Sequence, residues 1–140
     1  METTKKATVI GMMNDFMRDW ESRDTDTILA HFAPSATLCL YGTGADEKRV
    51  GLDEIQVQLE RDFAQSESLR CVLDWNLVGI SGPVAWVASD VMIHFKIAGQ
   101  DEMSFPARLS TVLQDYGGRW LFEHFHLSVA AANQEEGQSF

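Results

Sequence analysis

The spacing of apolar residues separates a helical first half of the chain from a strand-rich second half. In residues 7–20 the apolar side chains recur every three or four positions, which predicts an amphipathic helix. The same spacing predicts a second amphipathic helix over 52–66. Between them, Asp24 is a natural N-cap for a short helix over 25–32, which Pro34 ends. Three helices are therefore expected before residue 67.

From residue 69 the pattern changes to alternation, and Val, Trp, Phe and Ile become frequent. Turn residues, among them the Gly117-Gly118 pair, separate the alternating runs, as expected for an antiparallel meander. The predicted strands cover 69–80, 84–97, 102–116 and 119–130.

A shorter run at 36–41 predicts one more strand, and the Gly-rich, charged segment 42–51 is interpreted as a loop. Helices followed by a meander indicate the α+β class, because a parallel sheet would need helices alternating with strands. No internal repeat or linker interrupts the chain, so we expect one domain over residues 1–140.

Both sets of alternating positions in residues 84–97 contain apolar side chains. One set includes Val87, Val91, Ile93 and Phe95, and the other includes Trp86, Ala88, Asp90, Met92 and His94. Antiparallel strands that are apolar on both sides commonly pack against helices with one face and against a second subunit with the other. We therefore expect a homodimer through the open face of the sheet and a cavity between the other face and the helices.

The formal net charge is −10, and basic residues cluster only as Lys5-Lys6 and Lys48-Arg49. Nucleic acids and anionic membranes are therefore excluded as expected partners, because both are bound through clustered Lys and Arg. No stretch approaches the ~20 apolar residues of a membrane span, and no signal-peptide pattern is present, so a cytoplasmic location is expected. Cys39 and Cys71 lack metal-site spacing and are interpreted as small buried hydrophobic residues.

The segment 119–128, RWLFEHFHLS, has the most unusual composition for a core strand. In a regular strand alternate residues share a face, so two imidazoles and a hydroxyl would lie beside two aromatic rings. The residues of this predicted face are Trp120, Phe122, His124, His126 and Ser128. Buried polar groups need partners, which a ligand cavity supplies. The histidine pair has no evident third ligand, so no metal is expected.

The order of elements, the segment 120–128 and the segment 42–66, GTGADEKRVGLDEIQVQLERDFAQS, resemble the nuclear transport factor 2-like superfamily in its SnoaL-like branch. The resemblance implies three N-terminal helices packed on a curved antiparallel sheet, with a cone-shaped cavity between them. It implies no single function, because the superfamily includes isomerases, polyketide cyclases, dehydratases, transport adaptors and kinase association domains.

The His-x-His-x-Ser ending is also similar to that of the calcium/calmodulin-dependent kinase association domain. In that domain an Arg of the preceding strand lines the pocket, and the equivalent position here is Thr111. Arg108 is the alternative, and the turn at 117–118 decides its place. A two-residue turn sets Thr111 opposite His124, whereas a three-residue loop sets Arg108 opposite His126, and a bulge would reverse the faces.

These observations support three hypotheses. The first is a domain that binds a small apolar or weakly acidic molecule without a cofactor. The second is a cofactor-independent isomerase, cyclase or dehydratase in which Asp90 is the base, His126 or His124 is the acid and Tyr41 is a hydrogen-bond donor. The third is a non-enzymatic dimerisation or association domain. The candidate ligand-binding residues are Trp20, Phe32, Tyr41, Phe63, Trp75, Arg108, His124, His126 and Ser128.

Overall fold

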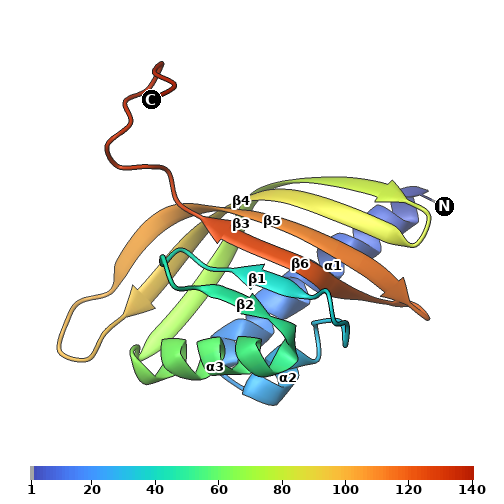
Figure 1. Cartoon of the computed structure of the whole chain (residues 1–140), viewed down its shortest axis with the longest axis horizontal. Helices are drawn as coiled ribbons and strands as arrows, with labels where there is room; N and C mark the ends of the chain where they lie inside the picture. Colours follow the sequence, from blue (N-terminus) through green and yellow to red (C-terminus); the bar gives the residue numbers. More distant parts are fainter. Residues whose placement is uncertain (1) are drawn as a thin grey trace.

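Residues 2–140, the part of the chain that the computed structural model describes, form two layers, with three helices on one face of a six-stranded sheet (Figure 1). The helices are α1 (Glu2–Ser22), α2 (Thr25–Leu29) and α3 (Gly51–Ala64). The strands are β1 (Cys39–Tyr41), β2 (Lys48–Val50), β3 (Ser68–Ser81), β4 (Val84–Lys96), β5 (Met103–Tyr116) and β6 (Arg119–Ser128). The predicted α+β class is confirmed.

The strands lie in the order β2-β1-β6-β5-β4-β3, and the sheet is curved and does not close (Figure 1). All neighbouring strands are antiparallel except β1 and β6, which are parallel. The four long strands predicted from alternation are confirmed, and each of their ends lies within two residues of the predicted position. α1 lies on one face of the sheet, closest to β3, and α2 and α3 pack together near one end.

The helices form where the apolar spacing predicts them. α1 buries Val9, Met13, Phe16, Met17 and Trp20, which recur every three or four residues and face the sheet. It begins earlier than the predicted residue 7. The Asp24 side chain caps α2 by accepting a hydrogen bond from the backbone N–H of Thr27 at 3.4 Å, as predicted, but α2 ends at Leu29.

The predicted loop over 42–51 was wrong in part, because it contains β2. This strand pairs with β1, with Cys39 opposite Val50 and Tyr41 opposite Lys48. Three residues, two of them Lys and Arg, are too few to show an alternating pattern. The shorter loop that remains, residues 42–47, lies beside α3.

A β-bulge decides which side chains of β6 face the helices. The turn at Gly117-Gly118 has two residues, so Leu113 lies opposite Phe122. The next pair is Val112 and His124, which leaves Glu123 as an extra residue on β6. Alternation restarts after the bulge, and the predicted shared face of 119–128 was therefore wrong. Phe122 and Phe125 face the core, whereas His124 and His126 face the opposite side.

The alternation predicted for β4 is confirmed. Val87, Val91 and Ile93 are buried under the helices, while Trp86 and Asp90 lie on the outer face of the sheet. Cys71 is buried on the inner side, which raises the pKa of its thiol to about 12, and Cys39 is partly exposed. Within residues 2–140, no helix combines the length and apolar character needed to cross a membrane.

Candidate functional site

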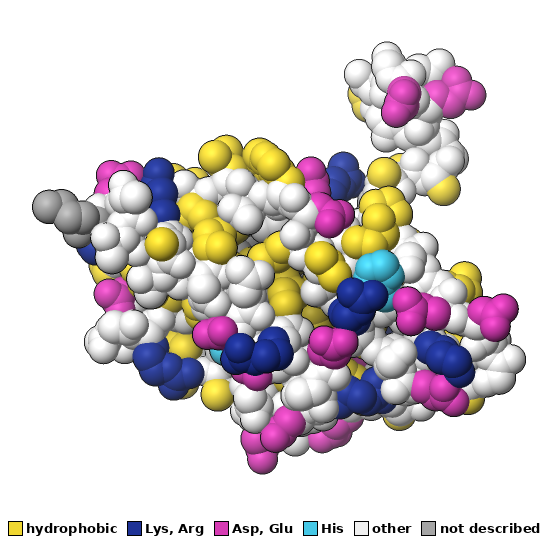
Figure 2. Space-filling model, turned by 180° about the vertical axis from the view of Figure 1, so that it is seen from behind, with side chains coloured by type: hydrophobic (Ala, Val, Ile, Leu, Met, Phe, Trp, Pro, Cys, Tyr) yellow, Lys and Arg dark blue, Asp and Glu magenta, His cyan; other side chains and the backbone are white. Residues whose placement is uncertain are grey.

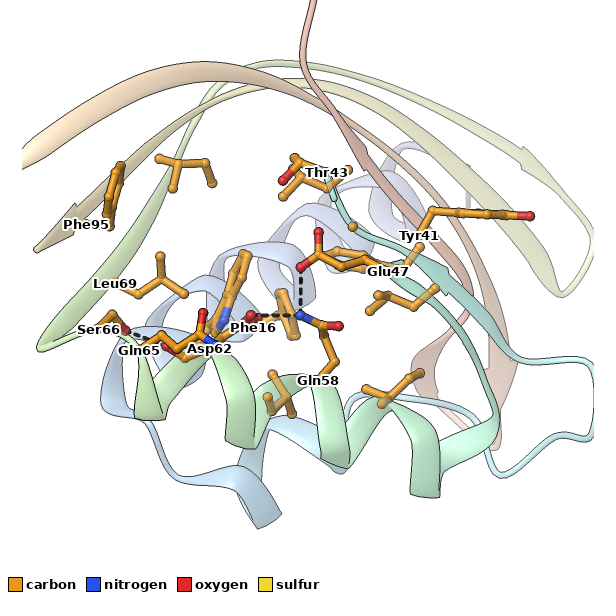
Figure 3. A pocket seen from close by; sticks show the side chains of 18 of the residues that line it. Phe16, Tyr41, Thr43, Glu47, Gln58, Asp62, Gln65, Ser66, Leu69 and Phe95 are labelled. Carbon is orange, nitrogen blue, oxygen red and sulfur yellow. Dashed lines mark hydrogen bonds between the residues drawn. The ribbon is translucent and has the colours of Figure 1, made fainter. Parts of the chain in front are cut away.

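A cavity of about 280 Å³ lies between the helices and the inner face of the sheet (Figure 3). Most of its wall is apolar and aromatic. The side chains come from α1, α3 and the long strands, and include Phe16, Trp20, Ile55, Ile93, Phe105 and Phe125. Because the strands curve, their inner faces cannot contact α3 along its whole length, and the space between them is open enough to hold a small molecule.

The polar side chains of the cavity gather at the end formed by α3 and the 42–47 loop. Gln58 and Asp62 are four residues apart on α3 and therefore lie on the same face of the helix. The Gln58 Nε2 atom donates hydrogen bonds to Asp62 Oδ1 at 2.8 Å and to Glu47 Oε1 at 2.7 Å (Figure 3). One amide thus links two carboxylates from different elements.

Gln58 is held in place on its other side as well. It is only 4% exposed, and its Oε1 atom accepts hydrogen bonds from Arg49 Nε at 3.0 Å and from Arg61 Nη2 at 3.4 Å. Every hydrogen of its amide group is donated to a carboxylate, so the amide cannot rotate without losing hydrogen bonds. The arrangement fixes where the two carboxylates meet the cavity.

Arg61 pins the 42–47 loop to α3. Its Nη1 atom lies 2.8 Å from Asp46 Oδ2, and its Nη2 atom lies 3.2 Å from Glu47 Oε1. The hydrogen bond from Arg61 lowers the pKa of Asp46, and the same bond raises the pKa of Arg61. The backbone N–H of Gly44 also donates to Glu47, and a Cβ at Gly44 would lie 2.7 Å from Glu47 Oε2. A side chain at residue 44 would therefore require the Glu47 carboxylate to shift.

Asp62 is the cavity residue with the most altered acidity. Burial raises the pKa of its carboxyl from 3.8 to about 6, because desolvation disfavours the charged form. The hydrogen bond from Gln58 opposes this shift, and the negative charge of Glu47 adds to it. Asp62 therefore titrates near pH 6, in a cavity where a ligand could contact it.

Trp20 contributes a further polar atom to the region. Its side chain lines the cavity, and its Nε1 atom is buried without a hydrogen-bond partner in the described residues. A buried N–H group without a partner costs free energy, so such a group is normally satisfied by water or by a ligand. This unsatisfied N–H donor is consistent with water or a ligand occupying the cavity.

The structure places only some of the predicted binding residues at the cavity. Trp20 and Phe32 line it, and Tyr41 lies at its edge. The Tyr41 ring points away from the cavity and packs against His126, with ring centroids 4.9 Å apart (Figure 3). Phe63 lies outside the lining, where the Arg23 guanidinium sits 4.7 Å from its ring centroid.

The remaining predicted residues lie on the outer face of the sheet. Asp90 is opposite Arg108, which is opposite Ser128, so three strands bring them into one row. Arg108 Nη2 donates to the Val129 carbonyl at 3.2 Å. Trp75, opposite Asp90, is 50% exposed. The alternation of β4 turns Asp90 outward.

The two histidines lie on this outer face because the bulge at Glu123 reverses their side of the strand. Their ring centroids are 6.2 Å apart. Burial, followed by the charge of His126, lowers the pKa of His124. Across residues 2–140, no cluster of three or more His, Cys, Asp or Glu side chains is arranged to hold a metal ion.

Sequence reasoning missed Glu47, Gln58 and Asp62. A signal was present, because Gln58 and Asp62 flank the apolar stripe of α3 at a spacing of four residues. Both also lie in the segment 42–66. Polar residues on a helix are usually interpreted as its solvent-facing side, and the curvature that opens a cavity beside them has no local signal.

Comparisons with known proteins agree with this architecture. A family model described as a SnoaL-like domain matches residues 9–132. None of the curated proteins matches the chain. Among solved structures, a nuclear transport factor 2-like superfamily protein from Salmonella enterica matches with a TM-score of 0.86 and 15% identity, covering 100% of both chains.

Two other solved structures have the same fold. A candidate scytalone dehydratase from Novosphingobium aromaticivorans has a TM-score of 0.83 and 15% identity, and the match covers 99% of this chain and 97% of that one. A candidate calcium/calmodulin-dependent protein kinase II association domain from Xanthomonas campestris has a TM-score of 0.79 and 17% identity, covering 89% and 86%. At such low identities the similarity establishes the fold and leaves the activity to the site.

Proposed function

The chain belongs to the SnoaL-like domain family of the nuclear transport factor 2-like superfamily, and we propose that it binds a small, largely apolar molecule in the cavity between its helices and its sheet. The observation that carries this proposal is the aromatic cavity of about 280 Å³ with its polar groups confined to one end. Small-molecule sites have this composition, because apolar walls supply affinity and a few polar groups set orientation.

The test uses cavity-filling substitutions. Titration calorimetry with a panel of compact aromatic and alicyclic compounds should identify binders of the wild-type protein. Ile97 lies at the cavity and is 37% exposed, so Ile97→Trp narrows the cavity without disturbing the core. We expect it to weaken binding about tenfold or more. Met92→Trp, on the outer face of β4, is the matched control and should bind as wild type.

Loss of binding in both tryptophan variants, or in neither, would contradict the proposed location. His126→Ala gives an additional comparison, because His126 is exposed and lies outside the cavity lining. Its affinity for every compound should equal that of the wild-type protein.

A second candidate function is cofactor-independent proton transfer, as in an isomerase, cyclase or dehydratase. The observation that favours it is Asp62, whose pKa of about 6 suits a general base at neutral pH. Asp62 takes the place of the Asp90 and His126 pair expected from the sequence. A substrate C–H bond would lose its proton to the Asp62 carboxylate, and the same group would return it.

Exchange of substrate protons with D₂O tests this function on a panel of activated ketones, followed by NMR. The exchange rate should rise with pH through about 6 and fall by about 100-fold or more in Asp62→Asn. Glu60→Gln, an exposed carboxylate two residues away on α3, is the control. Equal exchange in Asp62→Asn and wild type would exclude Asp62 as the base.

We also propose that the outer face of the sheet forms a homodimer. Trp75 and Leu77 on β3 and Trp86 on β4 are about half exposed or more. Trp86 lies directly over Gly79, where a Cβ would come within 2.1 Å of its Cε2 atom. Figure 2 shows hydrophobic side chains reaching the surface across the middle of one side of the molecule. An exposed apolar area of this kind commonly marks a protein interface.

Light scattering after size-exclusion chromatography tests the dimer. The double substitution of Glu for Trp75 and Leu77 should give a monomer, because it would bury four uncompensated charges across a symmetric interface. Val57→Glu, an exposed apolar residue of α3, is the control and should stay dimeric. A monomeric wild-type protein at tens of micromolar would contradict the proposal.

A further inference from the structure

The polar end of the cavity offers hydrogen-bond acceptors to a ligand. Both N–H groups of the Gln58 amide already donate, one to Glu47 and one to Asp62. Ionised carboxylates accept hydrogen bonds and donate none. Within residues 2–140, the Asp62 carboxylate accepts one hydrogen bond, from Gln58, and so has capacity left. A ligand that satisfies the remaining capacity of the Asp62 carboxylate must bring a donor, whereas the unpartnered Trp20 N–H needs an acceptor or a water molecule.

The charges around the cavity favour a positive donor. Asp62 and Glu47 line the cavity, whereas Arg49 and Arg61 do not. These arginines donate to Gln58, Asp46 and Glu47 from outside it. The charge of Glu47 already disfavours the ionised form of Asp62, so a bound cation would relieve this repulsion and a bound anion would add to it.

The aromatic wall favours the same kind of ligand. Phe16 packs against Trp20 and Phe125, with ring centroids 5.6 Å and 5.5 Å away, and all three line the cavity. Ammonium groups are attracted to aromatic faces, and the attraction strengthens when water is excluded. The net charge of −10 also raises the concentration of cations near the protein.

We propose that the cavity binds an apolar molecule carrying a protonated amine, with the ammonium group donating to Asp62 and its hydrocarbon part enclosed by the aromatic wall. This inference rests on the proposed binding function and adds the chemical class of the ligand. It departs from the weakly acidic ligand expected from the sequence, because the histidines and Arg108 that would hold an anion lie on the outer face. A volume of about 280 Å³ suits a compact arylalkylamine.

The test uses three ligands of one size: 3-phenylpropylamine, 3-phenylpropan-1-ol and 3-phenylpropanoate, titrated by calorimetry at pH 7.5. We expect the amine to bind about tenfold or more tightly than the alcohol, and the carboxylate to bind more weakly than either. In Asp62→Asn the amine should lose its advantage while the alcohol keeps its affinity. The control Glu60→Gln should preserve the order of the three ligands.

A pH series adds a second measurement. Asp62 faces Gln58 and Arg61 on α3, Glu47 from the 42–47 loop and Arg49 from β2. Protonation of Asp62 below about pH 6 should weaken binding of the amine and leave the affinity for the alcohol unchanged.

The possible outcomes distinguish failure of the proposed ligand class from failure of the proposed binding function. If the amine and the alcohol bind equally and Ile97→Trp blocks both, the ligand class is wrong and the binding cavity stands. If the advantage of the amine survives in Asp62→Asn, the inference is overturned as well. If none of the three ligands binds and no compound of the wider panel binds either, both the ligand class and the proposed binding function are contradicted.

Discussion

The inner face of β6 carries aromatic side chains and its outer face carries histidines, although the two sets belong to one strand. Phe122 and Phe125 are buried on the inner face and pack with Phe16 and Phe32. The outer face carries the two histidines, and His126 stacks on Tyr41. The groups with the most familiar catalytic chemistry thus lie on the side away from the cavity. The cavity takes its polar groups from α3 and the 42–47 loop instead.

This difference depends on one inserted residue. If Glu123 were paired with Val112 instead of forming a bulge, the register set by the Gly117-Gly118 turn would continue to the end of β6, and His124 would lie opposite Thr111. With the bulge, Phe125 lies opposite Thr111, which is buried on the inner face. The bulge therefore sets which residues of the strand form the wall of the cavity.

The largest effect is expected from deleting His126. The deletion moves Leu127 one position along β6, so Phe125 and Leu127 can no longer both lie opposite inward-facing residues of β5, and one of the two must turn outward. Exposing a large apolar side chain and leaving its space in the core unfilled costs about 4 kcal/mol or more of the free energy of unfolding. Urea unfolding and near-ultraviolet circular dichroism would measure it.

Glu123→Ala is the control for the deletion. It keeps the extra residue and loses only the hydrogen bond from the Tyr116 hydroxyl, on an exposed part of the sheet. Its free energy of unfolding should stay within about 1 kcal/mol of the wild type. A His126 deletion variant as stable as this control would show that the register of β6 does not fix the faces of Phe125 and Leu127.

Most of the fold could be predicted because its signals repeat along the chain. The stripe of α1 and the alternation of β4 each extend over ten or more residues, so the elements and the buried faces follow from period alone. β2 could not be found in this way, since it has three residues and takes its place by pairing with β1. Local pattern predicts long elements better than short ones that form through tertiary contacts.

The candidate site was less predictable for a related reason. Trp20 and Phe32, which were predicted as binding residues, line the cavity because they belong to the apolar side of the helical layer. The histidines were placed on the wrong face, because a single bulge cancels an inference based on alternation. Asp62 was missed because a carboxylate on a helix has the sequence pattern of a solvated residue. Its burial depends on the loop that Arg61 holds beside α3.

The second prediction compares neighbouring residues on the two faces. Phe125→Ala removes a ring that is 3% exposed and packs among four other aromatic rings of the core, and should cost about 3–5 kcal/mol. His126→Ala changes an exposed side chain and should cost about 0.5 kcal/mol or less. Thermal and urea unfolding of the two variants would measure the difference. Equal losses would contradict the assignment of the faces.

The third prediction concerns the effect of the buried Asp62 carboxyl, at the polar end of the cavity, on the free energy of unfolding. The pKa of Asp62 rises from 3.8 to about 6 on folding, so the folded state binds the proton more tightly. The free energy of unfolding should therefore fall as the pH rises from about 4 to about 6. Asp62→Asn removes this dependence and should stabilise the protein by about 1 kcal/mol at pH 7.5, after allowance for solvent near the carboxylate.

Urea unfolding at several pH values would measure this effect, with Glu60→Gln as the control, since Glu60 is exposed on the same helix. The control should keep the pH dependence of the wild type between pH 4 and 6. A difference in free energy of unfolding between wild type and Asp62→Asn that stays constant between pH 4 and 6 would contradict the raised pKa of Asp62. If the Asp62→Asn variant is more stable than the wild type, Asp62 does not contribute to folding stability, and its role lies in the cavity.

The smallest effect is expected from the coupling between the two histidines of the outer face. Burial lowers the pKa of His124, and the charge of His126 lowers it further. His126→Gln removes the second cause and leaves the first, so the pKa of His124 should rise part of the way toward its ordinary value. A depressed histidine pKa contributes stability at neutral pH that is lost as the pH falls below 6.5, so the variant should lose less of its free energy of unfolding on acidification.

NMR titration of the histidine ring protons measures this coupling directly. His94→Gln is the matched control, because His94 also lies on the outer face but contacts Ser104, at 2.6 Å, rather than the other histidines. It should leave the titration of His124 unchanged. An unchanged titration in His126→Gln would contradict the coupling. A change in cavity binding by the same variant would contradict the separation of the two faces, since the outer histidines would then reach across the sheet.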